Sequence, residues 1–240
     1  MAITWLATTK ESRFPPVESA TKQGLLAAGG DLSAERLLDA YTNGIFPWFN
    51  KNDPILWWSP DPRMVLHPDS IKISRSLKKT LKNRSLTVTL DQAFMAVMTA
   101  CAAPRAKQDT DPENSTWIHN SMLAAYNELH QLGYAHSVEC WQEGKLVGGL
   151  YGVAIGKVFF GESMFSFVRD GSKIALVALC QQLQRWQFPL IDCQIYSDHL
   201  ASMGAIEIPR TEFVRQLGLF CPQAQLRPQW SLDEDLPLVP

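Results

Sequence analysis

The chain has 240 residues, of which 46% are hydrophobic and 19% are charged, and its formal net charge is −2. A chain of this length and composition can bury a full core, in one large domain or in one domain with a small companion. The near-zero charge excludes a general binder of polyanions, so any contact with nucleic acid must come from a local patch.

The cysteine positions and the N-terminal residues argue against several classes of protein. The five cysteines are scattered, which excludes a zinc knuckle or a CxxC redox motif and indicates reduced, buried thiols. Residues 1–16 lack a charged start followed by an apolar run, so they are not expected to be a signal peptide. No window is long enough to span a membrane. We therefore expect a soluble, cytoplasmic protein.

The first quarter of the chain predicts one helix and an aromatic loop. Ser33 is the expected N-cap of the helix, and Gly44 is its expected stop. Residues 44–49 and 55–63 hold three tryptophans among several prolines, which argues against a regular helix or a central strand. This rigid aromatic loop either packs its own side chains over the core or forms the wall of a pocket for a planar ligand.

A basic run follows at residues 71–84, IKISRSLKKTLKNR, which contains no acidic residue. Ser74 can cap a helix whose inner face carries Leu77 and Leu81. A charge run is commonly a solvated face, but a run of one sign in a slightly acidic protein creates a local field suited to phosphates. The basic residues are Lys72, Arg75, Lys78, Lys79, Lys82 and Arg84.

The rest of the chain alternates strands and helices. Strands are expected at residues 86–90, 135–142, 146–155, 157–165, 190–196 and 206–208. Helices are expected at residues 91–102, with Asp91 as the cap, from just after Ile118 to Gly133, at 171–187, in a short turn capped by Asp198, and at 211–217. The loop at 103–115 is long enough to be flexible or functional. The acidic, proline-bearing tail at 226–240 is expected to be loosely ordered.

Three polar residues stand out on these apolar strands. Glu162 lies in the stretch GESMFS, residues 161–166, directly after an apolar run, so it is either a hydrogen-bonded structural carboxylate or a group held for chemistry. Asp192 and Gln194 are two apart and should project from one face of their strand. Because such groups are costly to bury unpaired, they should bond each other or a neighbour. A carboxylate–amide network of this kind can position a nucleophile or accept its proton.

The common catalytic motifs are absent. The sequence has no Walker loop, GxGxxG, HExxH or GxSxG, and its five histidines lack the spacing of metal ligands. The order strand–hairpin–strand–helix–strand resembles the acetyltransferase-like α/β fold, a mixed sheet with flanking helices. However, residues 169–175 do not match the coenzyme A signature of that superfamily, which suggests a different acyl carrier.

Together, five segments resemble the bacterial leucyl/phenylalanyl-tRNA–protein transferases, over a span from about Phe14 to about Leu217. The segments are GLLAAGGD (24–31), GIFPW (44–48), WWSPDPR (57–63), GESMFS (161–166) and IDCQ (191–194). The resemblance implies a small N-terminal α/β domain, residues 1–64, and an acetyltransferase-like catalytic domain, residues 65–240. It also implies that no metal and no nucleotide is used. We expect no cofactor and a monomer.

The resemblance implies transfer of leucine or phenylalanine, and less well methionine, from Leu-tRNA or Phe-tRNA to proteins with an N-terminal Arg or Lys. The products are marked for N-degron degradation. Asp192 would orient Gln194, whose amide oxygen would accept a hydrogen bond as the amine attacks the ester. Glu162 would join them and help to hold the incoming peptide. Either Gln194 or the vicinal ribose hydroxyl would relay the proton.

The remaining roles implied by the resemblance concern the tRNA. Trp48 and Trp117 would contact the terminal adenosine by stacking. The pocket for the transferred amino acid would include Leu150, Leu179, Ser163 and Met164. The residues expected to hold the acceptor stem through its phosphates are Arg75, Lys78, Lys79, Lys82 and Arg84.

Two departures from the family pattern concern the pocket and a loop. Leu150 and Leu179 stand where better-known members carry Met and Phe, which leaves the preference among Leu, Phe and Met open. Residues 106–113 form a longer insertion than the family leads us to expect. Two alternatives remain: a coenzyme A-dependent N-acyltransferase of the same fold, and a tRNA-binding module without catalysis.

Overall fold

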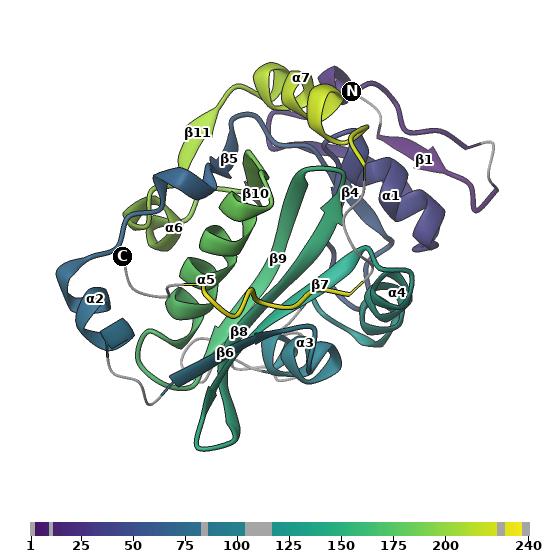
Figure 1. Cartoon of the computed structure of the whole chain (residues 1–240). Coiled ribbons are helices and arrows are strands. Elements are labelled where there is room, and N and C mark those ends of the chain that lie inside the picture. Colours follow the sequence, from purple (N-terminus) through teal and green to yellow (C-terminus); the bar gives the residue numbers. More distant parts are fainter. Residues whose placement is uncertain (1–2, 10–11, 83–85, 104–116, 225–228, 237–240) are drawn as a thin grey trace.

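The computed structural model describes residues 3–9, 12–82, 86–103, 117–224 and 229–236 (Figure 1). These residues form a four-stranded sheet in the order β1-β2-β4-β3 and a seven-stranded sheet in the order β11-β5-β10-β9-β8-β7-β6. Arg84, the insertion at 106–113 and almost all of the loop at 103–115 lie outside the described residues, so the predictions made for them are not addressed further.

The small sheet comes from the N-terminal part of the chain. Its strands are β1 (Thr4–Leu6), β2 (Leu25–Gly29), β3 (Phe46–Pro47) and β4 (Leu56–Trp58), and helix α1 spans Ala34–Thr42. Ser33 accepts from the backbone N–H of Arg36, which confirms the predicted N-cap. The expectation of an aromatic loop without a central strand is wrong, because β4 pairs with both β2 and β3. The prolines flank this strand and do not interrupt it, and Trp57 within it is fully buried.

The large sheet contains both antiparallel and parallel strand pairs. Strands β6 to β9 form an antiparallel meander, and α5 (Gly171–Arg185) then leads to β10, which pairs parallel to β9. The predicted mixed α/β sheet with flanking helices is thereby confirmed. The strands are β5 (Arg63–Leu66), β6 (Leu86–Leu90), β7 (Ala135–Gln142), β8 (Lys145–Ile155), β9 (Val158–Ser166), β10 (Leu190–Gln194) and β11 (Ile206–Ile208).

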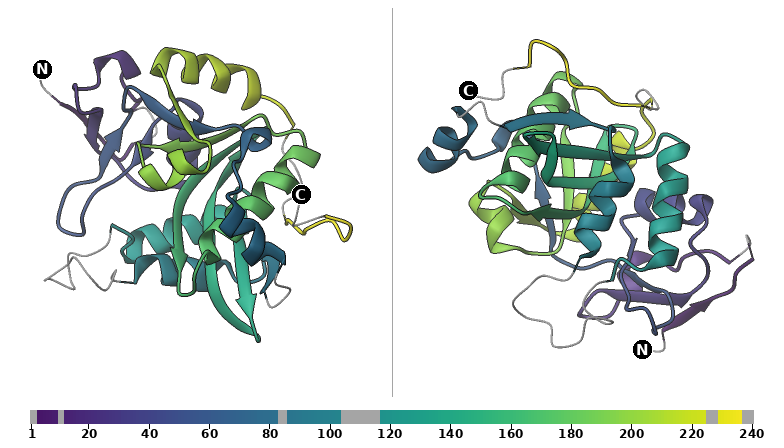
Figure 2. Two further views of the ribbon diagram at one scale, coloured as in Figure 1. Left: turned by 90° about the vertical axis from the view of Figure 1, so that its left-hand side faces the viewer. Right: turned by 90° about the horizontal axis from the view of Figure 1, so that it is seen from below.

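Helices cover both faces of the large sheet (Figure 2). Helices α3 (Phe94–Ala102) and α4 (Asn120–Gln131) pack on one face, and α5 packs on the other. The face under α3 and α4 shares one apolar cluster with the small sheet, since Trp57 of β4 and Phe160 of β9 both belong to it. Because the two sheets share this core, the domain boundary at residue 64 stays a prediction. The remaining helices are α2 (Arg75–Lys82), α6 (Asp198–Ser202), α7 (Arg210–Phe220) and the 3₁₀ turns Val17–Ser19 and Pro68–Ser70.

Glycine in β8 allows α5 to lie directly on the sheet. A Cβ atom on Gly148 would lie 2.6 Å from the carbonyl carbon of Gly171, the first residue of α5. A real side chain does not tolerate such a contact, so the glycine pair sets how closely the helix approaches the strand. Gly148 therefore has a packing function in this strand.

Two expected helix caps are wrong, and residues 229–236, the described part of the tail, are more ordered than expected. Ala93, not Asp91, precedes α3, and Ser197, not Asp198, precedes α6. The Asp91 carboxylate instead accepts from the backbone N–H of Trp230 at 2.8 Å and contacts His136 Nδ1 at 2.8 Å. Trp230 is buried and stacks on the His136 ring, with 3.8 Å between centroids. Residues 229–236 are therefore fixed to the sheet, because one tryptophan and one carboxylate anchor an otherwise polar segment.

Candidate active site

Two β-bulges bring the predicted polar residues together. In β9, Gly161 and Ser163 pair with the adjacent residues Gly152 and Tyr151 of β8, so Glu162 is the extra residue of a bulge. In β10, Asp192 and Gln194 pair with adjacent residues of β5, so Cys193 is the extra residue there. Bulges commonly re-aim a side chain beside a functional site.

The same bulges lie where two central strands separate. Backbone pairing between β9 and β10 ends at Phe160 and Asp192. Beyond this point the strands are joined by side chains, because Gln194 Nε2 donates to Glu162 Oε1 at 2.8 Å. The Glu162–Gln194 contact therefore spans the opening between β9 and β10, at the place where the sequence predicted chemistry.

The carboxylate of Glu162 is the centre of a hydrogen-bond network. Tyr41 of α1 donates to its Oε1 at 2.7 Å, and Tyr126 of α4 donates to its Oε2 at 2.9 Å. The hydroxyl groups of Tyr41 and Tyr126 also contact each other. Burial raises the pKa of Glu162 to about 7, although the three hydrogen bonds oppose this and the nearby charge of Asp192 adds to it. A carboxyl group with this pKa can exchange a proton near neutral pH.

Asp192 is held by a buried arginine. Arg63 Nε lies 2.8 Å from Asp192 Oδ1, and Arg63 Nη2 lies 2.6 Å from Oδ2, with both side chains fully buried. The guanidinium also donates to the carbonyl of Gly44 at 3.0 Å and lies between the rings of Phe46 and Phe213. Both oxygens of Asp192 therefore bond to Arg63, which fixes the orientation of the carboxylate.

Asp192 positions Gln194 through the backbone. The predicted regular alternation is broken by the bulge, and Gln194 has a φ of 64°, in the left-handed region. Asp192 Oδ1 accepts from the backbone N–H of Gln194 at 2.9 Å, which stabilises this uncommon conformation. The expectation that the two residues bond each other is thus confirmed, although the bond is to the main chain and not to the side-chain amide.

The two tryptophans predicted to stack on the terminal adenosine are Trp48 and Trp117. Trp48 is 42% exposed, and its ring lies 5.7 Å from that of Trp58. Trp117 is partly buried. The chain next to Trp117 lies against the chain next to Trp48, since the ring centroids of His119 and Phe49 are 4.9 Å apart. No direct contact joins the two predicted adenosine-binding rings among the described residues.

The apolar residues predicted for the amino-acid pocket share one cluster. Leu150 of β8 and Leu179 of α5 are buried in it, and Met164 packs against it from β9. Leu150 also pairs with Met164 across β8 and β9. Ser163 lies between Glu162 and Met164 in the same strand, is partly buried, and pairs with Tyr151 of β8.

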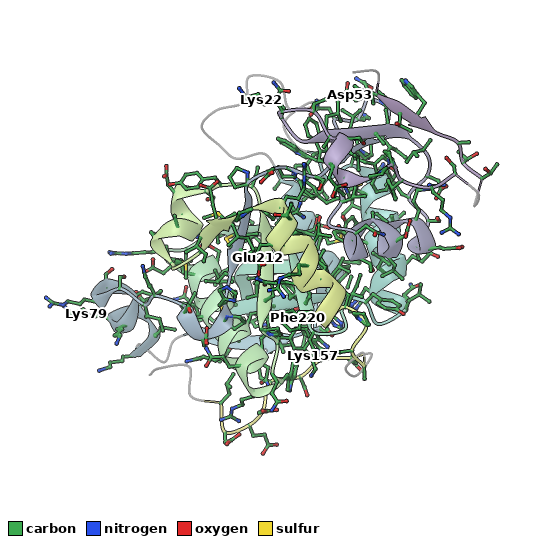
Figure 3. All side chains as sticks on the ribbon, turned by 90° about the horizontal axis from the view of Figure 1, so that it is seen from above. Lys22, Asp53, Lys79, Lys157, Glu212 and Phe220 are labelled. Atoms are coloured by element: carbon green, nitrogen blue, oxygen red, sulfur yellow. The ribbon has the colours of Figure 1, made fainter. Side chains whose placement is uncertain are left out.

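The predicted basic surface is an exposed helix. Arg75, Lys78, Lys79 and Lys82 are all exposed on α2, and Leu77 is buried beneath them. Ser74 accepts from the backbone N–H of Leu77, as predicted for the cap. Figure 3 shows Lys79 pointing away from the body of the protein. Within the described part of the chain, none of the four basic residues forms an ion pair, so their charge faces solvent.

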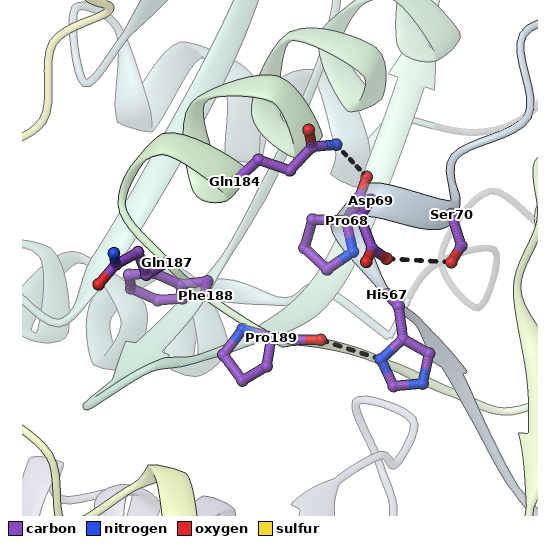
Figure 4. Close-up of a pocket in the computed structure, with 8 residues that line it drawn as sticks. All are labelled: His67, Pro68, Asp69, Ser70, Gln184, Gln187, Phe188 and Pro189. Atoms are coloured by element: carbon purple, nitrogen blue, oxygen red, sulfur yellow. Dashed lines mark hydrogen bonds between the residues drawn. The ribbon is translucent and has the colours of Figure 1, made fainter.

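Metal sites, membrane-spanning helices and hollows elsewhere on the protein are the other features that could bear on function. In the described ranges, no group of three His, Cys, Asp or Glu side chains is placed to hold a metal, and no helix has the length and apolar character of a membrane span. A hollow of about 690 Å³ near the end of α5 has none of the predicted site residues in its wall (Figure 4). Its lining is His67, Pro68, Asp69, Ser70, Gln184, Gln187, Phe188 and Pro189.

Three residues of the network were missed by the sequence analysis. Arg63 was part of the WWSPDPR segment but received no role. Tyr41 and Tyr126 were given no role in the predicted site. A tyrosine on the inner face of a helix carries a hydroxyl group that needs a partner when it is buried, and this could have signalled a polar site nearby.

A mixed sheet with a carboxylate–amide pair between two separated central strands is the framework of the candidate active site. Comparison with known families identifies the class of enzyme. The family described as leucyl/phenylalanyl-tRNA protein transferase matches residues 65–218, and its N-terminal domain matches residues 30–61. The chain therefore belongs to the leucyl/phenylalanyl-tRNA–protein transferase family.

Individual relatives agree with this assignment. The chain is 60% identical to the leucyl/phenylalanyl-tRNA–protein transferase of Nitrosomonas eutropha, over 93% of this chain and 94% of the relative. It is 54% identical to that of Nitrosospira multiformis, over 97% and 98% of the two chains. A GCN5-related N-acetyltransferase from Kribbella flavida is a distant structural neighbour, with a TM-score of 0.35, 12% identity, and coverage of 70% and 57%.

Proposed function

We propose that this chain transfers leucine or phenylalanine, and less well methionine, from aminoacyl-tRNA to the α-amine of proteins that begin with Arg or Lys. Family membership and one observation support the proposal. That observation is the orientation of the Gln194 side-chain amide, whose Nε2 faces Glu162. An ionised carboxylate only accepts hydrogen bonds, so the amide of Gln194 must turn its Nε2 toward Glu162. Its Oε1 then remains to accept from an incoming amine.

In this proposal the protein acts chiefly by positioning. The aminoacyl ester is already activated, so the demand on acid–base catalysis is modest. Arg63 fixes Asp192, Asp192 fixes the backbone of Gln194, and Gln194 Oε1 holds the amine beside the ester carbonyl. Holding two reactants in the attacking geometry can supply several kcal/mol of the barrier reduction, on the order of 7–11 in the best cases.

The substrates occupy the two sides of this network. Trp48 and Trp117 stack on the terminal adenosine, and Leu150, Leu179, Ser163 and Met164 form the pocket for the amino acid. The acceptor peptide carries an N-terminal Arg or Lys whose amine meets Gln194 and Glu162. The protein acts as a monomer in the cytoplasm, where aminoacyl-tRNA is made, and its products are marked for N-degron degradation.

The function is tested by a transfer assay with Leu-, Phe- and Met-tRNA and with peptides that begin with Arg, Lys or Ala. We expect labelled leucine and phenylalanine to reach the Arg and Lys peptides, methionine to be transferred more slowly, and the Ala peptide to remain unlabelled. Acetyl transfer from acetyl-CoA would instead support the coenzyme A-dependent alternative. Binding of tRNA without any transfer would support the non-catalytic module.

Reversing the charge of α2 is expected to weaken the use of tRNA without changing the chemistry. In the triple variant K78E/K79E/K82E, the KM for charged tRNA should rise several-fold or more and kcat should stay near the wild-type value, because phosphate contacts position the tRNA. The salt dependence of KM should become shallower, since fewer counterions are released on binding. Steady-state kinetics at several salt concentrations measure both effects.

Lys22 provides the control for this experiment. It is exposed in a loop of the N-terminal region, away from α2 (Figure 3). The variant K22E should leave the KM and its salt dependence unchanged. Equal effects of K22E and of a single α2 variant such as K78E would mean that net charge matters and that α2 is not a specific tRNA contact.

A further inference from the structure

The Glu162 carboxylate and the hydroxyl groups of Tyr41 and Tyr126 form a closed triangle of contacts. The hydroxyl of Tyr41 lies 2.7 Å from Glu162 Oε1, and the hydroxyl of Tyr126 lies 2.9 Å from Glu162 Oε2. The two hydroxyl groups also contact each other within hydrogen-bond distance. The members come from α1, α4 and β9, so the triangle exists only in the folded protein.

The number of protons decides which of these contacts are hydrogen bonds. With Glu162 ionised, the triangle holds two protons, one on each phenol, for three contacts. Both protons are then directed to the carboxylate, and the two phenol oxygens face each other without a proton between them. With Glu162 protonated, the third proton completes the triangle. Because Gln194 Nε2 already donates to Oε1, the acid proton belongs on Oε2.

The protonated triangle satisfies every member in one direction around the ring. Glu162 Oε2 donates to the oxygen of Tyr126, Tyr126 donates to the oxygen of Tyr41, and Tyr41 donates to Glu162 Oε1. We propose that Tyr41, Tyr126 and Glu162 form a hydrogen-bond ring that is complete only when the carboxyl group is protonated, and that this ring receives the proton released by the attacking amine. The two tyrosines are positioning residues that act through Glu162.

The charged and titratable surroundings agree with a group that changes its protonation state. Asp192 of β10 is the nearby like charge, and it is paired with Arg63 of β5. Tyr151 of β8 packs its ring 5.8 Å from that of Tyr126. Burial and the charge of Glu162 raise the pKa of Tyr41, Tyr126 and Tyr151 well above their usual value, so the phenols keep their protons. Glu162 is therefore the member of the ring that gains and loses a proton.

The chemical step, which rests on the proposed function, moves one proton of the acceptor nitrogen to Glu162 and a second to the ribose oxygen. The α-ammonium of the acceptor loses one proton to the Glu162 carboxylate, and the neutral amine attacks the ester carbonyl carbon. The new N–C bond forms, the C–O bond to the ribose breaks, and the second proton of the nitrogen leaves with the ribose oxygen. Glu162 then returns its proton to water, and the triangle holds two protons again.

The test is the sign of the pKa change in Y41F and Y126F. Either change removes two hydrogen bonds from the protonated ring but only one from the ionised state, and it also relieves the contact between the two oxygens. A bond to a carboxylate is about twice as strong as a neutral one, so these losses nearly balance and the relieved contact decides. The pKa of Glu162 should therefore fall below the wild-type value in both variants.

The pKa is measured by NMR titration of protein labelled with ¹³C at the glutamate carboxyl carbon, with the Glu162 signal assigned from its loss in E162Q. Y151F is the matched control. It removes a buried hydroxyl that has no hydrogen-bond partner in the described structure, so the pKa should not change. An unchanged or raised pKa in Y41F or Y126F overturns the ring, because phenols that only donate to the carboxylate would raise it on removal. If only one of the two variants folds, that variant is enough for the test. Thermal unfolding shows whether each variant is folded.

A second measurement separates the ring from its role in catalysis. The acidic limb of the pH profile of kcat/KM for leucine transfer should move to lower pH in Y41F and Y126F and stay in place in Y151F. If the NMR pKa falls but the acidic limb does not move, proton transfer to the ring is overturned. A chain without transfer activity would contradict the proposed function, while the NMR result would still decide whether the ring exists.

Discussion

Replacing Arg63 with methionine is expected to lower the free energy of unfolding by about 3–5 kcal/mol, because it leaves the buried carboxylate of Asp192 without its counter-charge. Both side chains are fully buried, and two hydrogen bonds join them. Since small domains are stable by only about 5–15 kcal/mol, this loss is severe. Urea denaturation followed by circular dichroism measures it. Transfer activity should fall as well, because Asp192 then no longer fixes the backbone of Gln194.

The double variant R63M/D192N tests the reason for the loss. Neither member of the former ion pair is then charged, so a large part of the lost stability should return, although the carbonyl of Gly44 still lacks its donor. Arg215, which pairs with Glu212 on the exposed side of α7, provides the matched control. R215M should cause no measurable loss, since exposed pairs contribute little. Equal losses in R63M and the double variant would contradict the buried-charge explanation.

The sequence analysis found the acidic and amide residues of the site because their chemical type conflicts with their surroundings. Glu162, Asp192 and Gln194 are polar residues on apolar strands, and burying such groups without partners is costly. This conflict can be recognised from a single sequence, without comparison with relatives. The strand–hairpin–strand–helix–strand order of the large sheet could be predicted in the same way, from the alternation of apolar runs and the punctuation by glycine.

The contacts within the site depend on long-range pairing, which local patterns do not encode. Glu162 and Cys193 become the extra residues of bulges only because of how β9 and β10 pair with their neighbours. The tyrosines reach Glu162 from helices 121 and 36 residues away in the chain, so no local signal points to the contact. The partner of Arg63, Asp192, is likewise 129 residues away in the chain, so no local signal points to this contact either. Residue type thus predicts which groups need a partner, and only the fold supplies it.

Replacing Glu162 with glutamine is expected to make the protein progressively more stable than the wild type as the pH rises from 5 to 8. The pKa of Glu162 is raised from 4.5 to about 7, chiefly by burial, so the folded state binds the proton more tightly than the unfolded state does. The resulting stabilisation is fully present below pH 4.5 and is lost as the pH rises through 7. The difference should reach at most about 3 kcal/mol, since one pKa unit corresponds to about 1.4 kcal/mol.

Glutamine isolates this effect because it resembles the protonated acid. Its amide can donate to Tyr126 and accept from Tyr41, so it can complete the same hydrogen-bond ring at every pH. Glu212 is the control with the opposite sign, because its hydrogen bonds with Arg215 lower its pKa to about 2. Stabilisation from Glu212 is lost only as the pH falls from 4.5 toward 2, so E212Q should keep a constant difference from the wild type between pH 5 and 8. Urea denaturation at several pH values measures both differences, and a constant difference for E162Q over this range would mean that Glu162 stays ionised in the folded protein.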